Sequence, residues 1–378
     1  MALGPALLQK RVIVCVGSGG VGKTTTAAAI ALRAAQQGLR VLCLTVDPAR
    51  RLAESLGLET LSSAEQVVDP ARLAAAGAPA GSSLTAMMLD TKATFDDLVA
   101  RHASSPEAAR RILSSKLYGH VATRLAGTHE YMAMEKLHSV REDPRFDLVV
   151  LDTPPTANSL DFLDAPDRIV AAVDAPATRW MSQASRGAGR TGLELLGRGT
   201  RFVLRAMSRF TGSGFLEDMA GFIADLNDLF GGFRKRAIAV RESLRQGDVA
   251  FVIVTTPEPM AVTEAIFFSK RLEEGGIPRD GFVVNRVRPR LAAPAAGSPA
   301  VLAPDLGLPA GNDALALARS LLRSYVEERT VSERHAREIA RLRARRGDSD
   351  WVEVPALDEE VYDLPALARI AKHLFGPS

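Results

Sequence analysis

The stretch Gly17–Thr25, with the sequence GSGGVGKTT, limits the fold of this chain more than any other feature. It fits the pattern G-x-x-x-x-G-K-[ST]. The fixed positions of the pattern are Gly17, Gly22, Lys23 and Thr24. Glycines let the backbone approach an anion closely, and successive N–H groups can then point at a phosphate. The alternative is a glycine turn that carries a lysine by chance.

The flanking residues favour the phosphate-binding interpretation. Residues 11–16 form an apolar, β-branched run, which is typical of a buried parallel strand. Residues 24–37 are rich in alanine and predict a helix that Gly38 closes. A strand, a glycine turn and a helix N-terminus make a P-loop, in which Lys23 reaches the β- and γ-phosphates and the Thr24 hydroxyl binds Mg²⁺.

Length and composition describe an ordinary globular protein. With 378 residues, the chain is one large α/β domain with insertions, or two domains. Its net charge of +3 is too small to indicate nucleic acid as a partner. We expect a cytoplasmic protein, because no signal peptide and no long apolar run is present. Cys15 and Cys43 are expected to be buried thiols, and no C-x-x-C zinc motif occurs.

A second strand is predicted at 41–46 and ends at Asp47-Pro48-Ala49. Asp47 therefore lies at the carboxyl edge of the predicted sheet, where doubly wound folds bind their ligands. The alternative role for Asp47 is the N-cap of a helix that begins near Pro48. Both roles are compatible.

A third apolar strand, predicted at 146–151, ends at Asp152. A strand that ends in Asp is the Walker B arrangement, in which the carboxylate meets the Mg²⁺ shell beside the P-loop threonine. One such Asp is weak support, but the P-loop about 130 residues upstream makes it strong.

Periodicity predicts the remaining elements. Further strands are predicted at 84–89, 251–255, 282–285 and 351–354, and helices at 91–140, 315–346 and 364–375. The helix at 315–346 contains Glu and Arg pairs such as Glu333 with Arg337. The simplest interpretation of these pairs is a solvent-exposed helix face. The closing helix is expected to pack on the sheet, with a membrane-surface role as the less favoured alternative.

Residues 176–246 differ in character from the rest and predict an inserted helical subdomain. Its apolar stripe at helical spacing consists of Phe215, Leu216, Met219, Phe222, Ile223, Leu226, Leu229 and Phe230. The stripe is either a surface for a client or partner, or the subdomain's own core. Residues 287–312 are rich in Pro and Ala and predict a mobile linker. Residues 1–378 otherwise form a single P-loop domain.

Four motifs in this order resemble one family. They are GGVGKTT, the DPA after the second strand, the DTPPT turn that begins at Asp152, and the late VNR that ends at Arg286. The chain resembles the deviant-Walker ATPases of the arsenical-pump and tail-anchored-protein-targeting type, often labelled anion-transporting ATPases. The resemblance implies an α/β fold of the P-loop NTPase, SIMIBI type: a doubly wound, mostly parallel sheet with an inserted α-helical subdomain. It also implies a dimer that binds ATP and Mg²⁺ at its interface.

The resemblance assigns roles to individual residues. It makes Asp47 the switch I aspartate that orients the attacking water, and Asp152 the switch II aspartate near Mg²⁺. It implies that Ala126–Glu130 is a dimer contact. The catalytic set is Asp47, Lys23 and Asp152; the metal set is Thr24, Asp47 and Asp152; the nucleotide-binding set is Gly19, Gly20, Val21, Gly22, Lys23, Thr24, Thr25, Asn285, Arg286, Pro355 and Leu357. In the last set, Asn285 reads adenine, and Pro355 and Leu357 belong to the loop that closes over the base.

Three departures from the family pattern bear on function. Ser18 stands where the family carries a lysine that crosses the dimer interface, so intrinsic turnover is expected to be low. The family's arsenite-binding cysteines and zinc-binding cysteines are missing, which argues against both sites. Asn158 replaces a usual switch II histidine.

The preferred function is an ATP-hydrolysing dimeric switch that couples nucleotide state to binding of a hydrophobic client or a membrane protein. The partner is a second copy or a lysine-bearing paralogue. Three alternatives stay open: the soluble motor subunit of an anion pump, a partitioning or positioning ATPase, and a nucleotide-binding partner with little turnover of its own.

Overall fold

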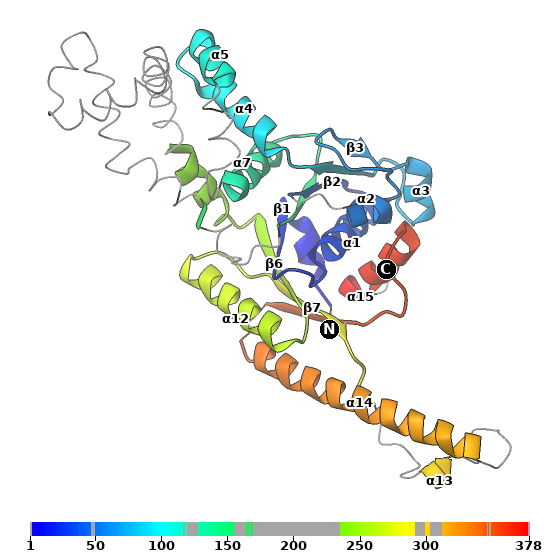
Figure 1. Ribbon diagram of the computed structural model, residues 1–378. Coiled ribbons are helices and arrows are strands. Elements are labelled where there is room, and N and C mark those ends of the chain that lie inside the picture. The colour runs from blue at the N-terminus through cyan, green and yellow to red at the C-terminus, as the bar shows by residue number, and fades with distance from the viewer. Residues whose placement is uncertain are drawn as a thin grey trace, which may run out of the picture.

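An eight-stranded sheet forms the centre of the computed structural model, with the strand order β3-β4-β2-β5-β1-β6-β7-β8 (Figure 1). The structure describes residues 2–46, 50–115, 118, 128–154, 164–165, 168, 235–291, 299–302, 312–345, 347 and 349–376. The strands are β1 (Val12–Val16), β2 (Arg40–Thr45), β3 (Gln66–Val67), β4 (Ser83–Met88), β5 (Leu148–Asp152), β6 (Val249–Thr255), β7 (Gly281–Val287) and β8 (Asp350–Pro355). Every pairing is parallel except that of the edge strand β3 with β4.

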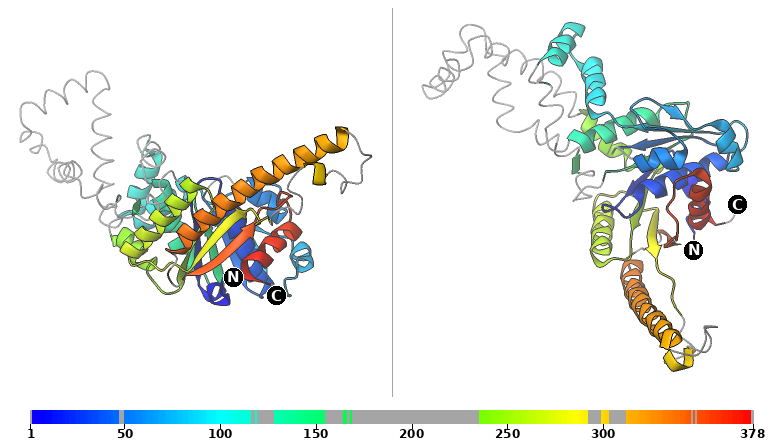
Figure 2. Two further views of the ribbon diagram at one scale, coloured as in Figure 1. Left: turned by 90° about the horizontal axis from the view of Figure 1, so that it is seen from below. Right: turned by 45° about the vertical axis from the view of Figure 1, so that its right-hand side comes forward.

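Helices cover both faces of the sheet, as Figures 1 and 2 show. They are the 3₁₀ helix η1 (Pro5–Gln9) and the α-helices α1 (Lys23–Gln36), α2 (Arg50–Leu56), α3 (Pro70–Ala75), α4 (Thr91–His102), α5 (Pro106–Ser114), α7 (Thr128–Arg141), α12 (Pro259–Glu274), α13 (Pro299–Leu302), α14 (Asn312–Arg343) and α15 (Leu364–Phe375). In the described part of the chain, no helix is both long and apolar enough to cross a membrane. The predicted α/β class, with a doubly wound and mostly parallel sheet, is confirmed.

Strand β1 explains how the two layers are built. Val12 and Val14 point to one face and join a core cluster with α7, α12 and α14. Ile13 and Cys15 point to the other face and pack with α1 and α15. Because both faces are covered, all five residues of β1 are buried, which is why the strand reads as a continuous apolar run.

Most predicted boundaries agree with the structure within about three residues, and the exceptions have local causes. The predicted helix at 91–140 contains three described helices, because Ala103 and the N-cap Ser105 end one helix and begin the next before Pro106. The edge strand β3 has only two residues and gave no periodic signal. The structure pairs Glu333 with Arg329 at 2.7 Å, so Glu333 with Arg337 was the wrong example of a helical pair.

The two predicted insertions are only partly described. Of residues 176–246, the structure describes 235–246, and the apolar stripe from Phe215 to Phe230 lies outside the described residues. Within 287–312 the structure shows the end of β7, helix α13 and the first residue of α14. Helix α14 extends well beyond the sheet and carries α13 at its far end (Figures 1 and 2). The insertion and the mobile linker stay predictions.

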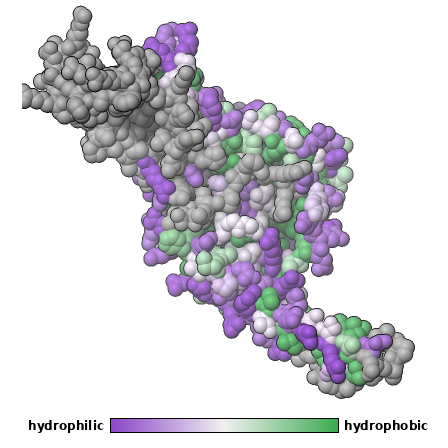
Figure 3. Space-filling view, in the orientation of Figure 1, coloured by the Kyte–Doolittle hydropathy of each residue, from purple (hydrophilic) through white to green (hydrophobic). Residues whose placement is uncertain are grey.

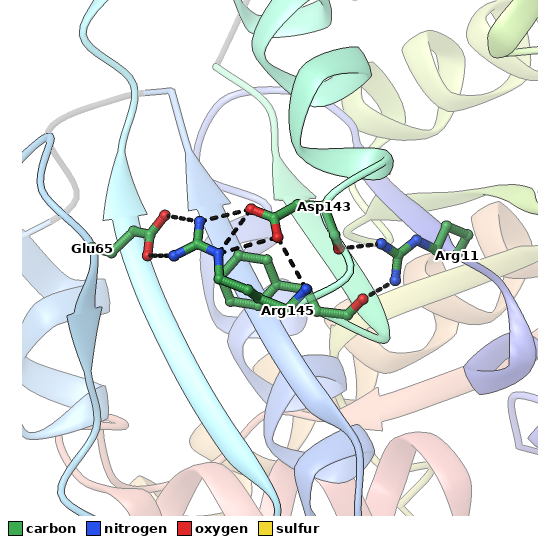
Figure 4. A network of polar contacts seen from close by, with 5 residues as sticks. Arg11, Glu65, Asp143 and Arg145 are labelled. Atoms are coloured by element: carbon green, nitrogen blue, oxygen red, sulfur yellow. Dashed lines mark hydrogen bonds and ion pairs between the residues drawn. The ribbon is translucent and has the colours of Figure 1, made fainter.

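A polar network fixes the turn that leads into β5 (Figure 4). Arg145 forms ion pairs with Glu65 at 2.8 Å and with Asp143 at 2.6 Å. The guanidinium of Arg145 lowers the pKa of Asp143. Arg11, just before β1, donates to the carbonyl oxygens of Arg141, Asp143 and Phe146. These bonds tie the start of β5 to the start of β1, so the far ends of both strands, which carry Asp152 and the P-loop, are held side by side.

Candidate functional site

The P-loop connects β1 to α1 at the carboxyl edge of the sheet, and two of its glycines have no substitute. A Cβ on Gly17 would lie 2.0 Å from the Val254 carbonyl oxygen of the neighbouring strand β6. Gly22 has a φ of +96°, and a Cβ there would lie 2.2 Å from Nδ2 of Asn285. A side chain at either position would push the loop away from the sheet, so these glycines set the shape of the cradle.

Helix α1 begins directly behind the loop, with Gly22 as its N-cap and no side chain bonded to its first amides. These amides and the helix dipole therefore present positive potential to the loop. Gly19 and Gly20 are exposed at the tip, Val21 is buried, and Thr25 is half-buried on the first turn of α1. The predicted backbone-binding residues thus lie together around one hollow turn.

Lys23 is 5% exposed and folds back over the loop. Its Nζ donates a hydrogen bond to the carbonyl oxygen of Ser18 at 2.8 Å. This places the ammonium group across the mouth of the turn, where a phosphate would find both a cation and the backbone amides.

Thr24 and Asp152 meet although 128 positions separate them. The Thr24 hydroxyl donates to Oδ2 of Asp152 at 2.6 Å, and the Thr45 hydroxyl lies 3.1 Å from the same oxygen. The strand register explains this, because β5 lies between β1 and β2 and pairs Asp152 with Cys15 on one side and with Thr45 on the other. Asp152 is 2% exposed.

This oxygen cluster fits Mg²⁺. Magnesium prefers oxygen ligands and is usually held by one or two protein groups together with substrate phosphates. A hydroxyl and a carboxylate beside the P-loop are such groups, so Thr24 and Asp152 would hold the ion. Asp47, the third predicted ligand, lies outside the described residues. The residue before it, Val46, is close to Asp152, because the Val46 amide donates to the Asp152 carbonyl oxygen at 3.3 Å.

The predicted adenine-reading residues lie at the same edge of the sheet. Nδ2 of Asn285 donates to the Val21 carbonyl oxygen at 3.1 Å, which joins β7 to the P-loop. Arg286 has the left-handed φ of +57°, and its amide donates to the side chain of Asn285. Pro355 is the last residue of β8 and pairs with Val287, while Leu357 is 37% exposed in the following loop. The structure therefore brings these residues to one side of the P-loop.

Sequence reasoning missed two polar groups of the site. Thr45 lies at the end of a predicted strand, two positions before Asp47, and this position could have indicated that it belongs to the site. Glu264 on α12 accepts a hydrogen bond from the Ser18 hydroxyl, a contact between residues 246 positions apart. No local pattern indicates Glu264.

Both cysteines lie beneath the site as buried free thiols. Burial, with the nearby Asp152 carboxylate, raises the pKa of Cys15 and of Cys43. The thiols stay protonated and pack as small apolar groups.

Comparison with known proteins agrees with this geometry. Residues 10–187 match the family model described as "Anion-transporting ATPase". The chain is 26% identical over 295 residues to "ATPase GET3" of Phaeosphaeria nodorum, a match that covers 75% of this chain and 79% of that protein. It is 26% identical over 290 residues to "ATPase GET3B" of Arabidopsis thaliana, covering 72% and 63%.

A third relative, an uncharacterized protein of Streptomyces coelicolor, is 31% identical over 189 residues, which covers 50% of this chain and 44% of that protein. In the last two relatives the matched region therefore spans less than two thirds of their own length. In this chain the P-loop, the Thr24–Asp152 pair and Asn285 lie together at the carboxyl edge of the sheet. These likenesses support an ATPase of the anion-transporting, ArsA/Get3-like type.

Proposed function

We propose that the protein binds ATP with Mg²⁺ in this P-loop and works as a dimeric switch, whose nucleotide state controls binding of a hydrophobic client. The observation that supports the nucleotide part most directly is the 2.6 Å contact of the Thr24 hydroxyl with the Asp152 carboxylate. In this contact the residues proposed as the Walker A hydroxyl and the Walker B carboxylate meet, close to the buried Lys23, which supports a shared metal site.

The residues divide the chemistry among them. The amides of the loop and of the first turn of α1 donate to the phosphates, and Lys23 counters their negative charge. Bound Mg²⁺ supplies further charge neutralisation to the phosphate oxygens. Thr24 and Asp152 hold the ion, Asp47 orients the attacking water, and Asn285 hydrogen-bonds the base. Positioning and electrostatics of this kind account for most of the catalysis in phosphoryl transfer.

Calorimetric titration of ATP with Mg²⁺ into wild type and Lys23→Ala tests the binding site. A hydrogen bond to a charged group is worth about 1.5–3 kcal/mol, so the affinity should fall by about 10- to 150-fold. Lys270→Ala is the matched control, since Lys270 is exposed on α12 away from the loop. Unchanged ATP affinity in Lys23→Ala would contradict the proposal.

A second variant isolates the metal ligands. Asp152→Asn keeps the size of the side chain but removes its charge, so ATP affinity should lose its dependence on Mg²⁺ while binding of ATP without the metal persists. The affinities are compared in excess EDTA and in excess Mg²⁺. Equal enhancement by Mg²⁺ in wild type and Asp152→Asn would exclude Asp152 from the metal site.

The dimer and the client are tested separately. Sedimentation analysis with ADP and with a non-hydrolysable ATP analogue measures whether the nucleotide changes the association of the chain with itself or with a lysine-bearing relative. Capture of binding proteins in the two nucleotide states, identified by mass spectrometry, distinguishes a hydrophobic client from the membrane subunit that this chain would bind as the soluble motor of an anion pump.

A further inference from the structure

Two adjoining hollows lie between helix α14 and the segment 287–291, where the chain leaves β7. Their volumes are about 720 Å³ and 440 Å³. Both are lined by Arg290, Ser332 and Ala336, so they form one elongated channel, which we call the α14 groove. The larger hollow alone has the volume of a typical ligand site.

Buried side chains hold the two walls of the α14 groove together. The Ser332 hydroxyl donates to the Pro289 carbonyl oxygen at 2.9 Å, and the Arg288 amide donates to Nδ1 of His335 at 3.3 Å. Ser332 is 4% exposed and His335 5% exposed. Because hydrogen bonds from buried groups join α14 to the opposite wall, the groove is preformed.

The rim of the groove carries an excess of positive charge. Five arginines and two glutamates line it: Arg288, Arg290, Arg329, Arg337, Arg343, Glu333 and Glu353. Glu333 pairs with Arg329, and Glu353 pairs with Arg343. Among the described residues, neither Arg290 nor Arg337 has a hydrogen-bond or ion-pair partner for its guanidinium group. Arg288 lies 3.9 Å from Glu328, outside the lining, so among the described residues Arg290 and Arg337 are the two arginines of the groove without a paired carboxylate.

The floor of the groove is apolar. Val287, Pro289 and Ala336 line it, together with the buried Ile339. Figure 3 shows the corresponding mixture over α14, where hydrophilic side chains alternate with hydrophobic ones. A guanidinium group matches a carboxylate in a two-pronged hydrogen bond, and an apolar floor accepts aliphatic side chains. Among the described residues that line the groove there is no Phe, Tyr or Trp, and the His335 ring is only 5% exposed, so the groove offers no open aromatic face for stacking nucleic-acid bases.

We propose that the α14 groove binds a segment of a partner protein in which acidic and apolar residues alternate. The acidic residues pair with Arg290 and Arg337 on the rim, and the apolar ones lie on the floor. An elongated, open channel suits an extended peptide better than an enclosed small molecule. The groove does not include the P-loop, although Val287 in its lining pairs with Pro355 of the proposed nucleotide-binding set, and its test uses no nucleotide.

The probe is a short fluorescein-labelled peptide of alternating Glu and Leu, titrated with the full chain and followed by fluorescence anisotropy. A peptide of alternating Lys and Leu is its matched control. We expect the acidic peptide to bind, the basic one not to bind, and the affinity to fall as salt screens the charges. Arg290→Glu and Arg337→Glu should each weaken binding by about two- to thirtyfold, since each reversal removes one exposed pair and adds a repulsion of similar size.

Two control variants separate the groove from the general basic surface. Arg323→Glu changes net charge equally on an exposed part of α14 outside the groove and should leave binding unchanged. Ala336→Trp fills the groove without changing charge and should abolish binding, whereas Ala316→Trp on the exposed face should not. Circular dichroism verifies that each variant is folded.

Three results would overturn the proposal. The first is failure of the wild-type chain to bind the acidic peptide. The second is an equal loss of binding in Arg323→Glu and in Arg290→Glu, or full binding in a folded Ala336→Trp chain. The third is displacement of the peptide by single-stranded RNA that binds more tightly and is weakened by the same groove variants.

Discussion

The hydroxyl of Ser18 donates a hydrogen bond to the carboxylate of Glu264, so the tip of the P-loop is attached to helix α12. The carbonyl oxygen of the same serine accepts a hydrogen bond from Lys23 at 2.8 Å. Ser18 is thus engaged on both sides within its own chain. Its side chain is short and uncharged, so it supplies no cation to a phosphate, and the carboxylate beside it adds negative charge at that point.

The first prediction follows from this pair. Purified alone, the chain should hydrolyse ATP slowly, and Ser18→Lys should raise its turnover number. A cation that contacts the transferred phosphate is worth about 10³–10⁵ in rate, but a lysine at position 18 would also pair with Glu264. We therefore expect Ser18→Lys combined with Glu264→Gln to exceed Ser18→Lys alone. Steady-state phosphate release measures all of these chains.

Glu264→Gln alone is the control and should stay slow, because it keeps a hydrogen-bond acceptor for Ser18 and adds no cation. Addition of a lysine-bearing relative should also accelerate the wild-type chain if a heterodimer is the active form. A wild-type chain that is already fast by itself, and gains nothing from Ser18→Lys, would show that the missing cation does not limit turnover.

The second prediction concerns Asp47. A group that orients the attacking water is worth about 10²–10⁴ in rate but little in ground-state binding. Asp47→Asn should therefore bind ATP with unchanged affinity and hydrolyse it more slowly by that factor. Asp90→Asn is the control, because Asp90 caps α4 and asparagine caps equally well. If affinity and turnover fall together, Asp47 acts as a structural cap for α2.

The third prediction separates two roles of Asn285. Its amide donates to the Val21 carbonyl oxygen of the P-loop, and we propose that it also reads the base. Loss of one hydrogen bond costs about 0.5–1.5 kcal/mol, so Asn285→Ala should weaken ATP binding by about two- to twelvefold. GTP serves as the internal comparison. A loss confined to ATP identifies base reading, whereas an equal loss for ATP and GTP identifies the loop contact alone.

The sequence was sufficient to predict the sheet and the P-loop because their signals are local. Residues 12–16 are all buried, so the strand had to be continuously apolar, and the glycines of the loop occupy positions that a Cβ would block. Helix α15 begins at Leu364 behind its N-cap Asp363, and both its bounds were predicted correctly. Such elements are determined by a few neighbouring residues.

Features that depend on distant contacts were not predictable in this way. Glu264 reaches Ser18 only because β6 lies next to β1 and directs α12 over that edge of the sheet. Glu333 lies within one helical turn of both Arg329 and Arg337, and the sequence alone does not choose between them. The α14 groove depends on how α14 packs on the segment after β7, and no periodic pattern in the sequence predicts that packing.

The fourth prediction is a pH dependence of stability. Nε2 of His102 lies 2.6 Å from Nη1 of Arg236, whose other nitrogen donates to the buried Glu135. Burial, and secondly Arg236, lowers the pKa of His102. The folded protein therefore keeps this histidine neutral where the unfolded chain already binds a proton. Stability should be complete above the ordinary histidine pKa of about 6.5 and should decrease as the pH falls below it.

Thermal unfolding of wild type and His102→Gln between neutral and mildly acidic pH measures this effect. The unfolding temperature of His102→Gln should fall less at acidic pH than that of wild type, because glutamine has no proton to take up. His373→Gln on α15 is the control, since that histidine is exposed. Identical pH profiles for wild type and His102→Gln would mean that the contact with Arg236 does not influence stability.

The last prediction concerns the apolar stripe from Phe215 to Phe230, which lies outside the described residues. Full burial of one large apolar side chain contributes about 1.5–3 kcal/mol, so leaving all eight in water would forfeit about 12–24 kcal/mol. That exceeds the stability of most domains, so something must cover the stripe: the subdomain itself, a partner subunit or a client.

Phe222→Asp combined with Leu226→Asp distinguishes these possibilities, with Asn227→Asp as the control on a polar position. We expect a folded chain that still binds ATP but no longer retains hydrophobic peptides, because two carboxylates within the stripe exclude an apolar ligand. A chain that fails to fold would instead make the stripe the core of its own subdomain, and retained peptide binding would place the client elsewhere.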